Sequence, residues 1–140
     1  MPNKFYPFDK RLEHRAIGSA ALTATTTLAT ISQRVAMRTA YLTRIMLESI
    51  DVSSGNELYT FVVEVSNDSF TTVEVAGMLT LGHSSVRQSG AASNVAGQLY
   101  EMMWESEVAG VVYKDARIRV IAAGTTPSIA PATYSTIMDC

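Results

Sequence analysis

Several short segments of this sequence place a large apolar residue at every second position. This pattern constrains the fold more than any other feature. In residues 58–65, Tyr59, Phe61 and Val63 occupy every second position, and residues 99–106 repeat the pattern. Successive side chains of a β-strand point to opposite faces of a sheet, so each segment is predicted to be a strand with one buried face. We find no convincing long helical pattern, which favours an all-β fold.

Turn-forming residues such as Ser53-Ser54-Gly55-Asn56 separate the alternating segments. We expect strands over residues 41–52, 58–65, 73–81, 99–106 and 111–123, the last being the longest, and a final edge strand over 128–138. Gly77 indicates a bulge or a close backbone approach, and Pro131 would be tolerated only at an edge or a bulge. The Thr-rich segment 16–32 is expected to be extended, 33–40 to form a short helical turn, and 82–97 to be a long loop.

Strands of this number, separated by turns, predict an antiparallel sandwich or barrel. The 140 residues are enough for one domain with its own core, and we assign 16–140 to it. The side chains expected to be largely buried are Tyr59, Phe61, Val63, Val75, Leu79, Trp104, Ile118 and Val120.

Residues 1–15 show no strand or helix period, and we expect them to form an extended N-terminal arm. The arm carries three aromatic side chains, which would rarely stay exposed on a free segment. Residues 1–44 hold seven basic and two acidic residues, whereas 45–140 hold four basic and eleven acidic residues. Such an asymmetry suits partner contacts, although it is equally typical of a solvated surface. The residues expected at a partner interface are Phe5, Tyr6, Phe8, Lys10, Arg11, Arg15, Arg34, Arg38 and Arg87.

Charge and cysteine content disfavour several functions. The net charge is −2, so binding to nucleic acid is not expected. The only cysteine is Cys140, which excludes an internal disulfide and a Cys-rich zinc site. No apolar stretch is long enough to span a membrane, and no apolar run follows the first basic residues, so we expect neither a membrane segment nor a secretory signal.

The candidates for catalysis are few. His83-Ser84-Ser85 pairs a base with hydroxyls but has no recognisable acid to orient it. Glu101 and Glu105 lie on one face of a predicted strand, where exposed acids are common. We therefore expect no enzyme activity, no cofactor and no metal. Arg117 and Arg119 share a strand face, and we favour cross-strand pairing with acids such as Glu64 or Glu74 over a role in partner binding.

A set of turns and strand ends carries a resemblance to a known family. The sequence has Gly55-Asn56-Glu57-Leu58-Tyr59 before one strand, Leu81-Gly82 at the end of the next, Arg117-Ile118-Arg119-Val120 within a third, and Gly124-Thr125-Thr126-Pro127-Ser128 after it. In these features residues 45–129 resemble the jelly-roll cement proteins that decorate capsids of tailed double-stranded-DNA phages. The first third of the chain matches only loosely.

The resemblance implies an antiparallel two-sheet jelly roll that stabilises an icosahedral head from its outer surface. The partner would be a major capsid protein of the HK97-like fold, and the protein would be made in the host bacterial cytoplasm and used in the virion. The family has no catalytic residues to carry over. The sequence does not fix the oligomeric state, but a small jelly roll with free edges often pairs, so we expect a homodimer. A ligand-binding β-sandwich, such as an adhesion or carbohydrate-binding module, is the alternative.

Overall fold

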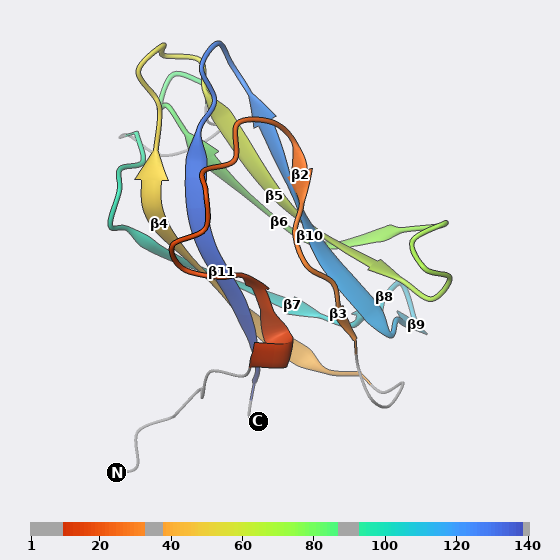
Figure 1. Cartoon of the computed structure of the whole chain (residues 1–140). Coiled ribbons are helices and arrows are strands. Elements are labelled where there is room, and N and C mark those ends of the chain that lie inside the picture. The colour runs from red at the N-terminus through yellow and green to blue at the C-terminus, as the bar shows by residue number, and fades with distance from the viewer. Residues whose placement is uncertain (1–9, 33–37, 87–92, 139–140) are drawn as a thin grey trace.

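The computed structural model describes residues 10–32, 38–86 and 93–138 and shows two antiparallel sheets packed into a sandwich (Figure 1). A 3-10 turn, η1 (Lys10–Leu12), is the one helical element in the described part of the chain. The strands are β1 (Glu13–Arg15), β2 (Thr26–Thr27), β3 (Ile31–Ser32), β4 (Ala40–Ile50), β5 (Leu58–Ser66), β6 (Glu74–Gly82), β7 (Leu99–Glu105), β8 (Glu107–Val108), β9 (Val111–Val112), β10 (Asp115–Ala123) and β11 (Ile129–Ile137).

The strand order is that of a jelly roll. One sheet has the order β1-β11-β4-β7, and the other has the order β2-β10-β5-β6, with β3 also paired to β10. The pairs β5–β6, β4–β7, β2/β3–β10 and β1–β11 are those of one long hairpin rolled up so that its strands alternate between two sheets. The prediction of an all-β, antiparallel two-sheet jelly-roll sandwich is therefore confirmed.

The core forms where the inner faces of the two sheets meet. Tyr59, Phe61 and Val63 on β5 are fully buried, as their alternation predicts, and Ile118 and Val120 beside them on β10 are buried too. Removing this much apolar surface from water is the main force that holds the sheets together. From the other sheet, Trp104 on β7 packs inward and stacks on Tyr41 of β4, with ring centroids 4.5 Å apart.

Strand β6 departs from its expected pattern. Val75 was expected to be buried but is 52% exposed, and Leu79 is only partly buried. The pairing slips between Val63–Gly77 and Glu64–Val75, so a bulge at this point reverses the alternation. Gly77 marks the bulge, and a side chain there would meet Met102 and Trp104 at 3.4 Å. The bulge expected from Gly77 is confirmed, and the burial of Val75 is a wrong prediction.

Two strands near the C-terminus also differ from expectation. The segment 111–123 is broken into β9 and β10. The amides of Tyr113 and Lys114 donate to Ser106 and Asn67 and not to the backbone of a paired strand. The longest strand is thus β4, with 11 residues. Strand β11 is not an edge strand, since β1 covers its outer side. Pro131 is accommodated by a bulge after Ala130, one of the two possibilities foreseen.

The turn motifs that carry the family resemblance meet at one end of the sandwich. Asn56 exchanges two hydrogen bonds with Thr125, at 2.9 and 3.0 Å. The buried Glu57 carboxylate accepts the amide of Ser54 at 2.9 Å, and its other oxygen lies 3.5 Å from the Thr126 amide. We call the group Asn56, Glu57, Gly82, Gly124 and Thr125 the turn clamp. It joins the β4–β5 turn to the β10–β11 turn.

The first described part of the chain crosses from one sheet to the other. We call residues 13–32 the strap: β1 pairs with β11, Leu22 bridges to Ile129, and β2 and β3 pair with β10 (Figure 1). The extended conformation predicted for 16–32 is confirmed. Residues 13–15 lie within the expected arm but form a strand of the sandwich. The helical turn expected near 33–40 falls mostly on undescribed residues, and Ala40 already belongs to β4.

Candidate functional site

The outer face of strands β4 and β7 carries large apolar side chains that are open to solvent. Met46 pairs with Leu99 across the two strands, and their exposed fractions are 42% and 52%. Met103 follows Leu99 on the same face of β7; it is 69% exposed and lies opposite Leu42 of β4. We call Met46, Leu99 and Met103 the methionine face. Strand β7 is an edge strand of its sheet, so the face extends to the rim of the sandwich.

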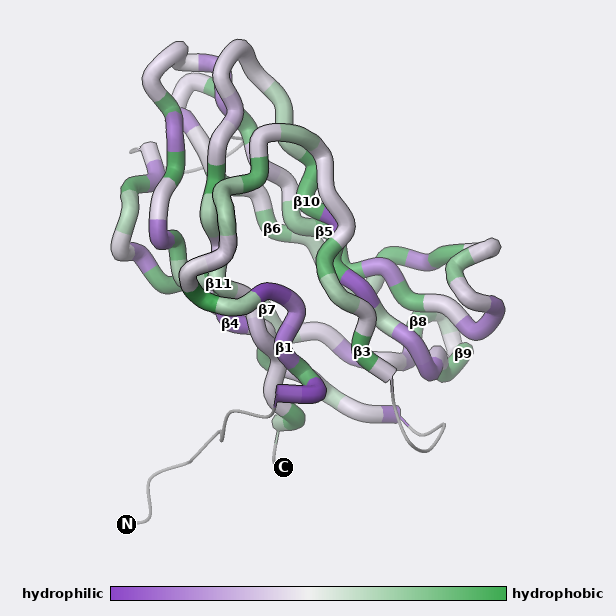
Figure 2. Tube along the Cα trace, in the orientation of Figure 1, coloured by the Kyte–Doolittle hydropathy of each residue, from purple (hydrophilic) through white to green (hydrophobic). Residues whose placement is uncertain are grey.

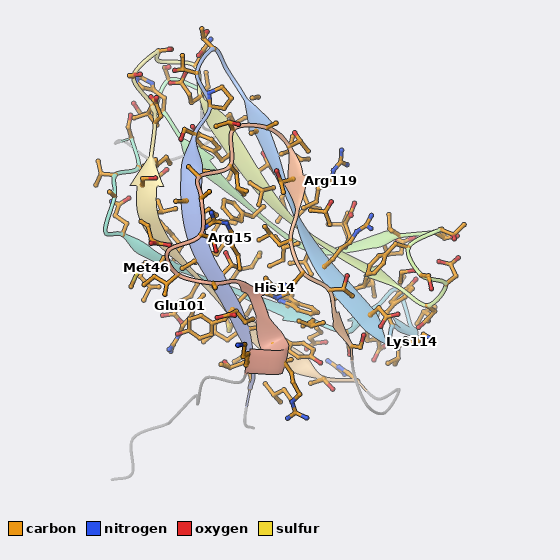
Figure 3. The ribbon with its side chains drawn as sticks, viewed as in Figure 1. His14, Arg15, Met46, Glu101, Lys114 and Arg119 are labelled. Atoms are coloured by element: carbon orange, nitrogen blue, oxygen red, sulfur yellow. The ribbon has the colours of Figure 1, made fainter. Side chains whose placement is uncertain are left out.

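The charged side chains on this face are paired with one another. Arg38 donates two parallel hydrogen bonds of 3.0 Å to Glu105, the fork geometry that makes Arg–carboxylate pairs strong. Arg44 lies 3.9 Å from Glu101, between the rows of apolar residues. Figure 3 shows Met46 and Glu101 projecting from the same side of the molecule. A partner could cover these residues without burying an unpaired charge, which would be costly.

The outer face of the other sheet is built differently. Arg117 bonds Glu64 at 2.9 Å, and its guanidinium lies 4.3 Å from the ring centre of Phe70. The cross-strand pairing expected for Arg117 is therefore confirmed. Arg119 is exposed and has no ion pair with a described residue. Figure 3 shows it on the opposite side from Met46. Covering this face would bury an unbalanced cation.

The structure separates the residues expected at a partner interface. Lys10 and Arg11 are exposed on η1, and Arg38 is exposed but bound to Glu105. Arg15 is buried, donates to the Ala20 carbonyl, and has its pKa lowered by burial against an opposing effect of Glu48. As folded here, it does not reach a partner. The remaining expected residues, Phe5, Tyr6, Phe8, Arg34 and Arg87, lie outside the described residues.

The two candidates for catalysis make local contacts. Ser85 Oγ lies 2.8 Å from His83 Nδ1 and 2.7 Å from the carbonyl oxygen of Gly55, so the serine hydroxyl joins two turns. No carboxylate in the described part of the chain bonds this imidazole. Glu101 and Glu105 face Arg44 and Arg38 as described above.

One concave feature of the described residues contains a carboxylate and is a candidate ligand site. A shallow depression of about 500 Å³ is lined by Ser49, Ile50, Asp51, Val52, Ser53 and Ser128. Its one carboxylate, Asp51, already accepts two bonds from Ser53. Across residues 10–32, 38–86 and 93–138 no three His, Cys, Asp or Glu side chains gather where they could hold a metal ion. The sole tryptophan, Trp104, is buried, so it offers no stacking platform for a sugar.

Comparisons with known proteins add no neighbour: no protein-family model, curated protein or solved structure matches this chain. None of the helical structure that is described could reach across a bilayer. The fold and the exposed surfaces are therefore the observations from which a function can be argued.

The sequence contained a signal for the methionine face that charge-based reasoning missed. Met103 falls on the outward side of residues 99–106, together with Glu101 and Glu105. A single outward apolar residue is common on protein surfaces, but several that adjoin one another mark an interaction site. Only the register between β4 and β7 shows that Met46 and Leu99 join it.

Proposed function

We propose that this protein is a structural capsid cement protein, which decorates the outer surface of a tailed-phage head and stabilises the shell through the methionine face. The partner in this proposal is a major capsid protein of the HK97-like fold. The protein acts by contact alone, without catalysis or a cofactor.

The observation that carries the proposal is the methionine face itself. It combines three exposed apolar side chains with two internal ion pairs on one sheet face at the rim of the sandwich. Interfaces that bind stably have an apolar centre in which charged groups are few or paired. The described residues supply no comparable arrangement for a small ligand.

The jelly-roll order supports the proposal through the family resemblance. The turns and strand ends that resemble capsid cement proteins form the turn clamp and parts of β5 and β10, the two inner strands of the second sheet. Fold alone does not define function, so this support is by analogy. A shell repeats one modest contact many times, and a rigid sandwich that bridges subunits gains from avidity.

The test is co-sedimentation with heads assembled without this protein, taken from the phage whose genome encodes it. Wild-type protein should pellet with the heads and saturate at a fixed ratio to capsid subunits. Met103→Glu should weaken binding by about tenfold or more, since it places an unpaired charge within the apolar contact. Binding is read from the protein left in the supernatant over a concentration series.

Met78→Glu is the matched control. Met78 is 64% exposed on the outer face of the other sheet, so the substitution is equally tolerable for folding. It should leave head binding unchanged. A wild-type protein that does not bind heads would refute the proposed function, whereas loss through Met78→Glu but not Met103→Glu would refute the choice of face.

A further inference from the structure

A chain of buried hydrogen bonds runs through the centre of the first sheet and ends in the strap. Trp104 Nε1 donates to Thr43 Oγ1 at 2.7 Å, and Thr43 Oγ1 lies 2.7 Å from Ser135 Oγ. Ser135 Oγ lies 2.8 Å from His14 Nε2, and His14 Nδ1 lies 3.0 Å from the Ala29 carbonyl oxygen. Thr43, Ser135, Trp104 and His14 are all at most 4% exposed. We call these four side chains the His14 network.

The two ends of the network fix the direction of every proton in it. A carbonyl oxygen only accepts, so His14 Nδ1 carries the proton that bonds Ala29. In the neutral imidazole Nε2 is then bare and accepts the Ser135 hydroxyl. Ser135 has no second proton, so it accepts the hydroxyl of Thr43, which in turn accepts from Trp104. Each donor is used once, and the network is complete only while His14 is neutral.

A proton on Nε2 breaks this order. The Ser135 hydroxyl would have to turn away from Nε2 and would lose the acceptor that it has in the network. A buried donor without an acceptor is costly, and a buried charge without a counter-ion is more so. Both costs fall on the contact between the strap and β11.

Within residues 10–32, 38–86 and 93–138, no charged group bonds the imidazole in a way that would compensate for a proton. The groups turned toward it are the Ser135 hydroxyl of β11 and the Ala29 carbonyl, with Thr43 of β4 behind Ser135. Its strand neighbours Glu13 and Arg15 do not bond it, and Lys10 and Arg11 of η1 are exposed. Burial lowers the pKa of His14 from 6.5 to about 4, with the Ala29 hydrogen bond opposing the shift.

His14 also closes the strap on itself. Besides the side-chain bond, the Ala29 amide donates to the His14 carbonyl at 3.1 Å, so both ends of the intervening loop meet at one residue. Between them, the strap is joined to the sandwich by the Leu22–Ile129 bridge, the pairing of β2 with β10 and the Leu28–Ile118 bond, and the Leu28 side chain is buried in the core. Figure 3 shows His14 between the strap and the sheet.

We propose that His14 is a proton-sensitive lock for the strap: when the imidazole takes up a proton, residues 13–32 detach from β11 and β10 while the rest of the sandwich stays folded. Detachment would turn β11 and β10 into open edge strands. Such edges are competent to pair with a strand from a neighbouring protein.

The pH range and the size of the effect follow from linkage. In the detached strap His14 is solvated and takes its ordinary pKa of 6.5, whereas in the closed strap the pKa is about 4. Because the detached state binds more protons in this range, the closed strap is fully stable above pH 6.5 and loses stability as the pH falls toward 4. The ratio of detached to closed strap should rise by up to about tenfold per pH unit between the two pKa values, and by roughly 80-fold from pH 6.5 to pH 4.

Amide hydrogen exchange on the full-length protein measures this ratio. Protection factors, taken relative to the unstructured rate at each pH, are followed for Leu22, Leu28 and Ala29 in the strap and for Phe61 and Val62 of β5 in the core. Between pH 6.5 and 4, strap protection should fall by up to about tenfold per unit while core protection stays nearly constant. Parallel loss in both regions, or a flat profile in the strap, would overturn the proposal.

Three variants identify the group responsible. His14→Gln keeps a donor and an acceptor without titrating, so it should abolish the pH dependence. Glu48→Gln removes the carboxylate that accepts the Gly18 amide at 3.0 Å, and His83→Ala removes the other histidine; both should keep the pH dependence. Loss of the dependence in either would overturn the assignment to His14.

A spectroscopic measurement keeps the proposal falsifiable if His14→Gln fails to fold. In the closed wild-type protein, the imidazole ¹⁵N shifts must show a neutral ring with the proton on Nδ1 well below pH 6.5. A ring that is protonated at pH 6, or that carries its proton on Nε2, would refute the network.

Discussion

Glu57 and His14 do the same structural task with different chemistry. Each is a buried polar side chain that fastens segments far apart in the sequence: Glu57 joins two turns at one end of the sandwich, and His14 joins the strap to β11. The carboxylate of Glu57 receives backbone amides, which are donors at every pH. The imidazole of His14 must donate on one side and accept on the other, which only its neutral form can do. Of the two fastenings, only the strap therefore depends on a neutral imidazole.

The largest effect should come from crowding the turn clamp. In Gly82→Ala the new methyl would lie 2.3 Å from the Glu57 carbonyl oxygen, at a φ of +142° that disfavours side chains. Overpacking and strain together should lower the free energy of unfolding by about 3 kcal/mol. Urea denaturation measures the change. Gly97→Ala, with a φ of +89° but nothing within 4 Å, is the control and should cost about 1 kcal/mol. Equal losses in the two variants would mean that the close approach is not rigid.

A smaller loss should follow from changing the hydrogen-bonding character of Glu57. In Glu57→Gln one carboxylate oxygen becomes an NH₂ group, which would face a backbone amide donor. We expect the free energy of unfolding to fall by about 2 kcal/mol, as is typical for an unsatisfied buried donor. Glu74→Gln on exposed β6 should change it by less than about 0.5 kcal/mol. A neutral Glu57→Gln would show that the clamp is held by Asn56 and Thr125 instead.

The smallest change should come from the middle of the His14 network. Ser135→Ala removes the donor to His14 and the acceptor of Thr43, and it should cost about 1 kcal/mol at pH 7.5. The loss should be greater in strap amide protection than in core amide protection. Ser19→Ala, an exposed strap hydroxyl that bonds Ala16, is the control and should leave both unchanged. A Ser135→Ala protein that keeps full amide protection in the strap would show that the His14 network does not hold the strap in place.

Local pattern predicted the central strands well, because their alternation reports directly which side is buried. It failed at Val75, where one bulge moves the side chain to the other face, and a bulge position is set by the partner strand. It failed to show β1, since Glu13-His14-Arg15 is a hydrophilic stretch without strand character, as Figure 2 shows. That strand is held by β11 and by the His14 network, neither of which is visible in local sequence.

The candidate surface was predicted less well than the fold. Arginines were chosen for their charge, but Arg15 is buried and Arg38 is bound to Glu105. A sequence gives the number of charges and not their partners, which depend on the register of strands that are far apart in the sequence, such as β4 and β7. The apolar residues that form the methionine face are adjacent only through the β4–β7 pairing.

The pairing of β1 with β11 has a consequence for how the protein is made. The first described strand completes its sheet beside the last one, so its partner leaves the ribosome more than a hundred residues later. At ordinary translation rates this delay is on the order of ten seconds. During that time the nascent strap has no docking site, and the aggregation-prone edges of the growing sheets lack their cover. Synthesis of the C-terminal strand therefore sets the earliest moment at which the molecule can close.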